Sequence, residues 1–325
     1  MGQGDQIRRH QGQLNRGTSS QQRDRARRIG ALMPFDENDP VGKPRLPAFT
    51  HALAQLGWTD GRNVRMDLRW FGADTDRIRA LAQELVGLQP EVIVTAGVPT
   101  TTALQRETRT IPIVFANAGD PIASGLVPHL NQPGGNVTGF ANYEATLSSK
   151  YLELLSEIAP GLMRAAIMFN PDFPAPSVFM SSFEAAARSL KVVPIIAHVH
   201  SDVEIETGII ALGREPGGGL VAMDSFTFVH RAPIILAAAR NNVPAVYGAS
   251  VYARDGGLLS YGPDLVDTNR RVATYIDRIL RGAKPGDLPV QFPVKYETVL
   301  NLKTAKALGL TVPQSIRLRA DEVVE

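Results

Sequence analysis

Short apolar runs and amphipathic stretches alternate along the chain from about residue 28 onward. The apolar runs have the length and composition of buried strands, and the stretches between them have helical apolar spacing and stop at Gly or Pro. In the first half, strands are predicted at Ile29–Phe35, Asn63–Trp70, Glu91–Ala96, Ile111–Ala116 and Val137–Asn142, with helices at Leu46–Leu56, Arg77–Leu88 and Thr100–Thr108. This β-α-β series predicts a parallel sheet covered by helices on both faces.

The pattern restarts after Asn142. Strands are predicted at Arg164–Phe169, Val192–Val199, Leu220–Met223, Ala245–Tyr247 and Leu258–Tyr261, with helices at Thr146–Ile158, Ser177–Leu190, Val203–Leu212, Val229–Asn241, Leu265–Arg281 and Leu302–Leu308. So many parallel strands would stretch a single twisted sheet, so we expect two α/β lobes of Rossmann-like build.

The restart and the late extended segments predict the domain boundaries. Lobe one is expected at 28–142 plus 264–288, and lobe two at 143–263 plus 289–300. Residues 301–325 are expected to form a C-terminal helix and tail that pack on the lobes. Residues 1–27, rich in Gln, Arg, Ser and Gly, are expected to form a disordered basic tail.

The charge distribution separates this tail from the folded body. Residues 1–28 hold seven arginines and two aspartates, whereas the rest of the chain has 27 basic and 30 acidic residues. A nucleic-acid-binding body should instead carry a basic face, so no nucleic-acid partner is expected. No apolar run is as long as a membrane span, and the tail lacks the apolar stretch of a secretory signal. We interpret the tail as a misassigned N-terminus or as one that lacks its signal. The alternative is a basic arm that contacts lipid or nucleic acid.

The loops after the strands are the expected site, because ligands of open parallel sheets bind beyond the carboxyl ends of the strands. These loops are polar, small and aromatic, which suits a small organic solute. The predicted ligand-binding residues are Phe35, Gly97, Val98, Pro99, Thr100, Thr101, Asn117, Asp120, Asn142, Asn170, Asp224, Ser225, Tyr247, Gly248 and Tyr261.

Three of these positions predict particular contacts. The loop at Gly97–Thr102 opens a helix, where free N–H groups and Thr hydroxyls favour a carboxylate, with plain N-capping as the alternative. Asp120 and Asp224 could accept hydrogen bonds from an amine or hydroxyl of the solute, or could only form local turns.

Signals for catalysis, metals and cofactors are weak. The chain has no Cys, which excludes disulfides and a cysteine nucleophile. It has no phosphate-binding glycine loop, no nucleophile elbow and no dinucleotide fingerprint after the first strand. His198 and His200 share one face of a predicted strand, but no third ligand has metal-site spacing. We expect no enzyme activity, no metal and no cofactor.

At these loops the chain resembles the substrate-binding proteins of bacterial ABC importers, in the group that includes tryptophan-type binding proteins. The similar segments are Ile111–Phe115, Gly119–Pro121, Gly125–Val127, Pro133–Gly139, Leu259–Pro263, Gly282–Pro285, Asp287–Val290 and Asn301–Leu310. They follow the same order from about Arg28 to Glu325.

The resemblance implies a type I periplasmic-binding fold, with two lobes joined by three crossing segments and one solute bound by cleft closure. It implies an amino acid, aromatic or other, or a related carboxylate as the solute, and an ABC permease in the inner membrane as the partner. A periplasmic or membrane-anchored, monomeric protein is expected. The alternatives are a ligand-sensing regulatory module of the same fold and an α/β enzyme.

Overall fold

The computed structural model describes residues 26–34, 39, 42–72, 76–142, 144, 146–172 and 177–325. It divides into two compact units. Unit 1 takes the chain up to Asn117, then Leu126–Phe140 and Asn269–Val290, and unit 2 takes Ala118–Gly125, Ala141–Thr268 and Gln291–Glu325. Apart from the short Ala118–Gly125 segment, the chain passes between the units after Phe140, Thr268 and Val290. The predicted two-lobed α/β class with three crossing segments is confirmed.

Unit 1 is built on a five-stranded sheet with the order β2-β1-β3-β4-β5. Its elements are β1 (Arg27–Met33), α2 (Arg45–Gln55), β2 (Val64–Trp70), α3 (Arg77–Gly87), β3 (Val92–Ala96), α4 (Val98–Glu107), β4 (Ile113–Ala118), β5 (Val137–Ala141), α11 (Leu265–Leu280) and the 3-10 turn η1 (Pro285–Asp287). In β1, β2, β3 and β4 the neighbouring strands run parallel. The α/β pattern of the first half of the chain therefore forms one sheet, as predicted.

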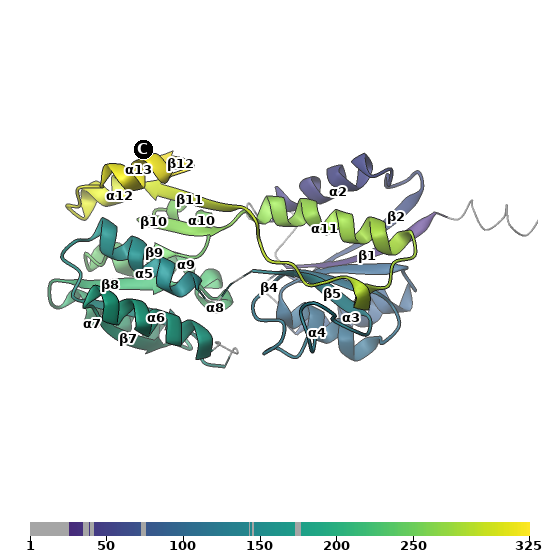
Figure 1. Ribbon diagram of the computed structural model, residues 1–325, viewed down its shortest axis with the longest axis horizontal. Helices are drawn as coiled ribbons and strands as arrows, with labels where there is room; N and C mark the ends of the chain where they lie inside the picture. The colour runs from purple at the N-terminus through teal and green to yellow at the C-terminus, as the bar shows by residue number, and fades with distance from the viewer. Residues whose placement is uncertain are drawn as a thin grey trace, which may run out of the picture. The chain divides into compact units, whose positions relative to one another are not determined.

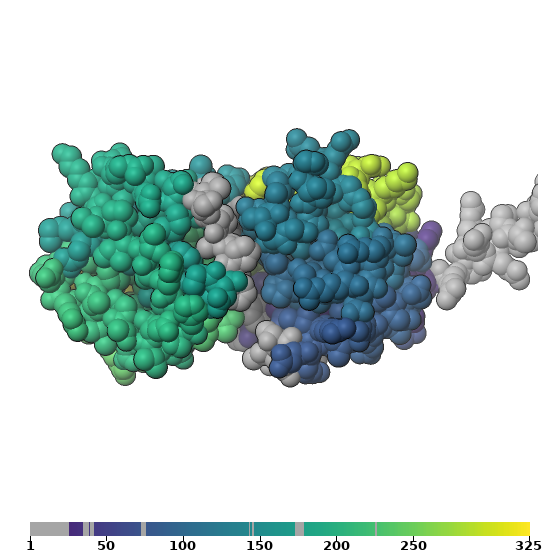
Figure 2. Space-filling model, turned by 90° about the horizontal axis from the view of Figure 1, so that it is seen from below, coloured from purple at the N-terminus to yellow at the C-terminus, as the bar shows by residue number. Residues whose placement is uncertain are grey.

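Alternating strand residues bury both faces of this sheet. Ile29, Ala31 and Met33 of β1 pack in a core shared with α2 and α11, and these two helices lie on the same side of the sheet in Figure 1. The segment that contains most of α11 thus returns to unit 1 from late in the sequence. Figure 2 shows its yellow-green atoms among the blue atoms of this unit.

Unit 2 is built on a seven-stranded sheet with the order β12-β11-β10-β9-β8-β6-β7. Its elements are α5 (Leu147–Ile158), β6 (Arg164–Phe169), α6 (Ser177–Leu190), β7 (Val193–His198), α7 (Asp202–Gly213), β8 (Gly218–Ala222), α8 (Ser225–Val229), α9 (Arg231–Arg240), β9 (Ala245–Tyr247), α10 (Ser250–Arg254), β10 (Leu259–Pro263), β11 (Tyr296–Asn301), α12 (Leu302–Ala307), α13 (Gln314–Arg319) and β12 (Glu322–Val324). Residues of α5 and α6 share one core with the sheet, and residues of α7 and α9 share the other. Within this sheet β11 runs antiparallel to β10.

The two sheets repeat one strand order. Counted along the chain within each unit, the first five strands are arranged 2-1-3-4-5. The order reverses between β1 and β3 in unit 1, and between β6 and β8 in unit 2. Ligands of open α/β sheets bind beyond the carboxyl ends of the strands at such a reversal. The fold therefore gives each unit one edge where solute contacts are expected.

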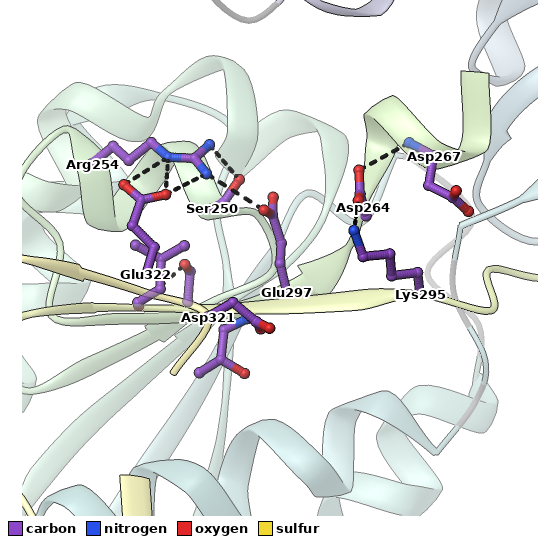
Figure 3. A network of polar contacts seen from close by, with 11 residues as sticks. Ser250, Arg254, Asp264, Asp267, Lys295, Glu297, Asp321 and Glu322 are labelled. Atoms are coloured by element: carbon purple, nitrogen blue, oxygen red, sulfur yellow. Dashed lines mark hydrogen bonds and ion pairs between the residues drawn. The ribbon is translucent and has the colours of Figure 1, made fainter. Parts of the chain in front are cut away.

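The C-terminal residues complete the sheet of unit 2, whereas the sequence predicts only a helix and a tail after Asn301. Strand β12 pairs with β11. Figure 3 shows Arg254 at the end of α10 pointing at Glu322 of β12 and Glu297 of β11, with nitrogen–oxygen distances of 2.7 and 3.4 Å. One guanidinium thus ties the last strand to the sheet. A three-residue strand carries too little periodicity to be recognised from the sequence.

Two other elements differ from their predicted bounds. The helix predicted at Val229–Asn241 is α9, with Pro233 in its first turn, where a missing N–H is tolerated. The short helix α8 before it was not predicted, and a capping box at Asp224 starts it. Strand β1 begins at Arg27, inside the predicted tail, and its N–H donates to the Asn63 carbonyl at 3.0 Å.

Candidate functional site

The carboxyl ends of four strands of unit 1 line one pocket. The space amounts to about 370 Å³, including its open mouth. Its lining residues are Met33, Pro34, Gly42, Arg45, Leu46, Phe49, Trp70, Ala96, Asn117 and Asn269. The pocket lies at the reversal between β1 and β3, the edge at which the strand order places a ligand.

The pocket combines apolar walls with few polar groups. Phe49 from α2 and Trp70 at the end of β2 supply aromatic surface. Arg45, the first residue of α2, is the one charged side chain among the described lining residues. An apolar pocket with a few convergent polar groups is the usual form of a small-molecule site. The single cation favours a solute with a carboxylate.

Asn117, a predicted site residue, lines this pocket from β4. Its backbone is left-handed, with φ of 57°, a conformation that Asn adopts more readily than most residues. Its Nδ2 and Oδ1 atoms are buried and have no hydrogen-bond partner among the described residues. Asn142 is also a predicted site residue, and its buried Oδ1 atom has no hydrogen-bond partner among the residues that the structure describes.

The loop after β3 uses its hydroxyls locally. Gly97 precedes α4 with φ of 86°, which a side chain would strain. The Thr100 hydroxyl donates to the Ala96 carbonyl at 2.7 Å, and the Thr101 hydroxyl donates to the Gly97 carbonyl at 2.6 Å. Among the described lining residues, only Ala96 comes from this part of the chain.

None of the five predicted residues of this loop lines the pocket that the structure describes; they are Gly97, Val98, Pro99, Thr100 and Thr101. Binding of a solute carboxylate at the start of α4 stays a prediction. The alternative of a Thr N-cap is not what the described loop shows, because Gly97 is the N-cap and no side chain caps it.

Asp120 forms a local turn. Its Oδ1 accepts hydrogen bonds from the Ile122 and Ala123 N–H groups, each at 3.0 Å. These bonds match the turn-forming alternative that the sequence left open. The other oxygen, Oδ2, has no such bond within the described turn, so a contact with solute stays a prediction.

In unit 2, Asn170 and Asp224 meet at the reversal between β6 and β8. The Asn170 N–H donates to Asp224 Oδ2 at 3.0 Å, and the Thr227 N–H donates to Asp224 Oδ1 at 2.7 Å. Burial raises the pKa of the Asp224 carboxyl, although these hydrogen bonds oppose the shift. Asp224 therefore ties the loop after β6 to the start of α8.

The aromatic residues predicted in unit 2 differ in exposure. Tyr247 is 1% exposed and stacks on Tyr252, with ring centroids 4.5 Å apart, and burial raises the pKa of its hydroxyl. It belongs to the core that contains α7 and α9. Tyr261 is only partly buried and stacks on Tyr296 at 5.3 Å, so it keeps surface for another contact.

Three predicted residues remain to be placed. Gly248 packs against Met223, where an added Cβ would lie 3.1 Å from the Met223 Cα atom. Phe35 and the side chain of Ser225 lie outside the described part of the chain.

Several lining residues were missed from the sequence. Trp70 ends the second strand, so the rule that selected the other strand ends also selects this one. Arg45, Phe49 and Asn269 come from helices, and no local sequence signal directs them to a strand edge.

Over the described residues, no group of three or more His, Cys, Asp or Glu side chains is arranged to hold a metal ion. In the same part of the chain, none of the helices has both the length and the apolar character needed to cross a membrane.

Known proteins similar to this chain share its fold over most of its length. A crystal structure of a conserved domain protein from Vibrio cholerae O1 biovar El Tor is 26% identical and covers 92% of this chain and 100% of that one, with a TM-score of 0.83. A domain from Streptococcus pneumonia in complex with L-Trp gives the same TM-score and coverage at 24% identity.

A curated relative and a family model agree with this fold. The tyrosine-binding protein of Clostridioides difficile (strain R20291) is 25% identical over 276 residues, which are 85% of this chain and 78% of the relative. The model of the ABC transporter substrate binding protein family matches residues 44–324. The chain belongs to this family of ABC transporter substrate-binding proteins.

Proposed function

We propose that this substrate-binding protein captures a free amino acid with an aromatic side chain. The observation that carries the proposal is the unit 1 pocket, in which Phe49 and Trp70 face the same space as Arg45. Aromatic walls favour a flat apolar side chain, and the guanidinium favours the carboxylate. The similar tyrosine-binding protein supports the same solute class.

The remaining expectations about its role follow from membership in the family. We infer that the protein delivers its solute to an ABC permease, works outside the cytoplasm as a monomer, and binds without catalysing a reaction. The geometry described for the pocket is that of a binding site.

A thermal-shift screen tests the proposal. L-tyrosine, L-tryptophan and L-phenylalanine should raise the free energy of unfolding, by about 2.7 kcal/mol at a hundredfold excess over the dissociation constant. L-aspartate and a neutral sugar should not. Stabilisation by the sugar alone, with no response to aromatic amino acids, would refute the proposed solute class.

Two variants link the response to the pocket. Trp70→Leu removes an aromatic wall and should abolish most of the shift. Leu236→Ala changes a side chain on α9 of unit 2 that is 49% exposed, and should leave the shift unchanged. Equal shifts in both variants would show that the solute binds elsewhere.

A further inference from the structure

The amide of Asn117 is a buried polar group that folding leaves unpaired. Both Nδ2 and Oδ1 are buried without a hydrogen-bond partner among the described residues. Buried polar groups in native proteins are almost always paired, because an unpaired one loses its bonds to water and gains nothing in return. This amide is therefore a polar group of the pocket whose hydrogen-bonding capacity the described residues leave unused.

The backbone at Asn117 is a second unusual feature of this residue. Its φ of 57° lies in the left-handed region, although the residue belongs to β4. Strained backbone conformations persist where the surrounding structure holds them, and they gather at ligand sites. Two unusual features thus coincide at one residue, and that residue lines the unit 1 pocket.

We propose that Asn117 selects the solute by its head group, forming hydrogen bonds to both the α-carboxylate and the α-ammonium of a free amino acid. This inference rests on the proposed function and adds the part of the solute that is recognised. An amide carries two N–H donors and one acceptor oxygen, so one side chain can donate to the carboxylate and accept from the ammonium. The amide can form these bonds without losing a hydrogen bond to another described residue.

The other lining groups leave this role to Asn117. Arg45 can donate to the carboxylate but cannot accept from an ammonium group. Among the described lining residues, the side-chain oxygens belong to Asn117 and Asn269, and the amide of Asn117 is the one that is buried without a hydrogen-bond partner among the described residues. No carboxylate of the described lining competes for the ammonium.

The variant Asn117→Gly tests the inference, because Gly keeps the left-handed backbone and removes the amide. Asn242→Gly is the matched control: Asn242 has φ of 52°, is exposed and lies in unit 2 after α9. Each protein is titrated calorimetrically with L-tyrosine, with tyramine, which lacks the carboxylate, and with hydroxyphenylpropionate, which lacks the ammonium.

Wild type and Asn242→Gly should bind L-tyrosine equally and discriminate against both analogues. Asn117→Gly should bind L-tyrosine at least about a hundredfold more weakly, as expected for the loss of two hydrogen bonds to charged groups. It should also lose most of its discrimination against hydroxyphenylpropionate. Unchanged affinity, or unchanged discrimination, in Asn117→Gly would overturn the role of Asn117 while tyrosine binding by the wild type left the proposed function intact.

Thermal unfolding without solute gives an independent readout. Because the amide is unpaired, Asn117→Gly should unfold at a temperature no lower than that of Asn242→Gly. A markedly lower temperature would mean that the amide has a partner in the unliganded protein, and the inference would fail. If the wild type bound none of the aromatic amino acids, the proposed function and this inference would fail together.

Discussion

Hydrogen-bond partners separate the polar residues at the carboxyl edges of the two sheets into different roles. Asp120 and Asp224 both follow strands, but the first accepts from its own turn, whereas the second accepts from the loop after β6 and from α8. The hydroxyl of Thr100 donates back to the Ala96 carbonyl at the end of β3. Asn117 has no such partner among the described residues. A residue already satisfied within the fold positions its neighbours, whereas an unsatisfied one is available to a solute.

Arg45 is expected to hold the carboxylate of the solute, since it is the one charged side chain of the described pocket lining. Arg45→Gln should weaken L-tyrosine binding about ten- to a hundredfold, because a hydrogen bond to a charged group contributes about 1.5–3 kcal/mol. Arg62→Gln, at an exposed position before β2, should bind as the wild type does. Calorimetric titration measures both, and equal affinities would place the carboxylate away from Arg45.

The buried carboxyl of Asp224 should give stability a measurable pH dependence. Its pKa is raised in the folded state, so the folded protein binds this proton more tightly than the unfolded chain does. The contribution of Asp224 to stability therefore becomes more favourable as pH falls through the folded pKa towards the unfolded value.

Asp224→Asn has no titrating group at this position. The free energy of unfolding of the wild type, relative to that of the variant, should rise from about pH 7 to about pH 4. Urea titrations at several pH values measure this difference. A difference that fell over the same range would mean that the hydrogen bonds to Asn170 and Thr227 outweigh burial.

At the scale of the element, close backbone packing joins β4 to β5. An added Cβ at Gly139 would lie 2.1 Å from the Phe115 carbonyl oxygen, far inside van der Waals contact. Gly208 lies within α7, where an added Cβ would meet only Met168 Cε at 3.7 Å. The same chemical change therefore has opposite consequences in these two elements.

Gly139→Ala should destabilise unit 1 by more than about 3 kcal/mol, as overpacking against backbone does. Gly208→Ala should stabilise unit 2 by up to about 1 kcal/mol, since Ala is the better helix former. Chemical unfolding monitored by circular dichroism measures both. A neutral Gly139→Ala would show that β5 can move away from β4 without loss.

Helices and strands could be predicted where their apolar pattern extends over several residues, and short elements that depend on particular contacts were missed. Several strands have short apolar runs that identify them in the sequence, as in Ile113–Ala116 of β4. The short helix α8 starts at a capping box between Asp224 and Thr227 and was missed although this signal is local. Strand β12 depends on Arg254 and on pairing with β11, contacts between residues far apart in sequence that no short window of the chain contains.

At the scale of the whole molecule, strand order located the site better than residue type did. The predicted α/β alternation implied two parallel sheets, and each sheet has the order that reverses once. Residue type alone gave a wrong indication of which side chains are accessible. Tyr247 ends a strand, as predicted, but its side chain lies in the core. Trp70 and Asn117 line the pocket, although only Asn117 was predicted. Side-chain direction at a strand end follows from packing, which composition does not encode. Closure of the two units around the solute stays a prediction.

The basic N-terminal segment should be dispensable for solute binding. Residues 1–25 lie outside the described part of the chain, whereas β1 begins at Arg27 and the pocket lining begins at Met33. Deleting 1–25 should therefore leave both the unfolding temperature and the L-tyrosine affinity unchanged at physiological salt. The segment carries five arginines and two aspartates, and its field is screened beyond about 8 Å under these conditions. Repeating the titration at low salt separates a long-range charge effect from a direct contact. A tenfold loss of affinity that persisted at high salt would show that the segment touches the solute or supports the pocket.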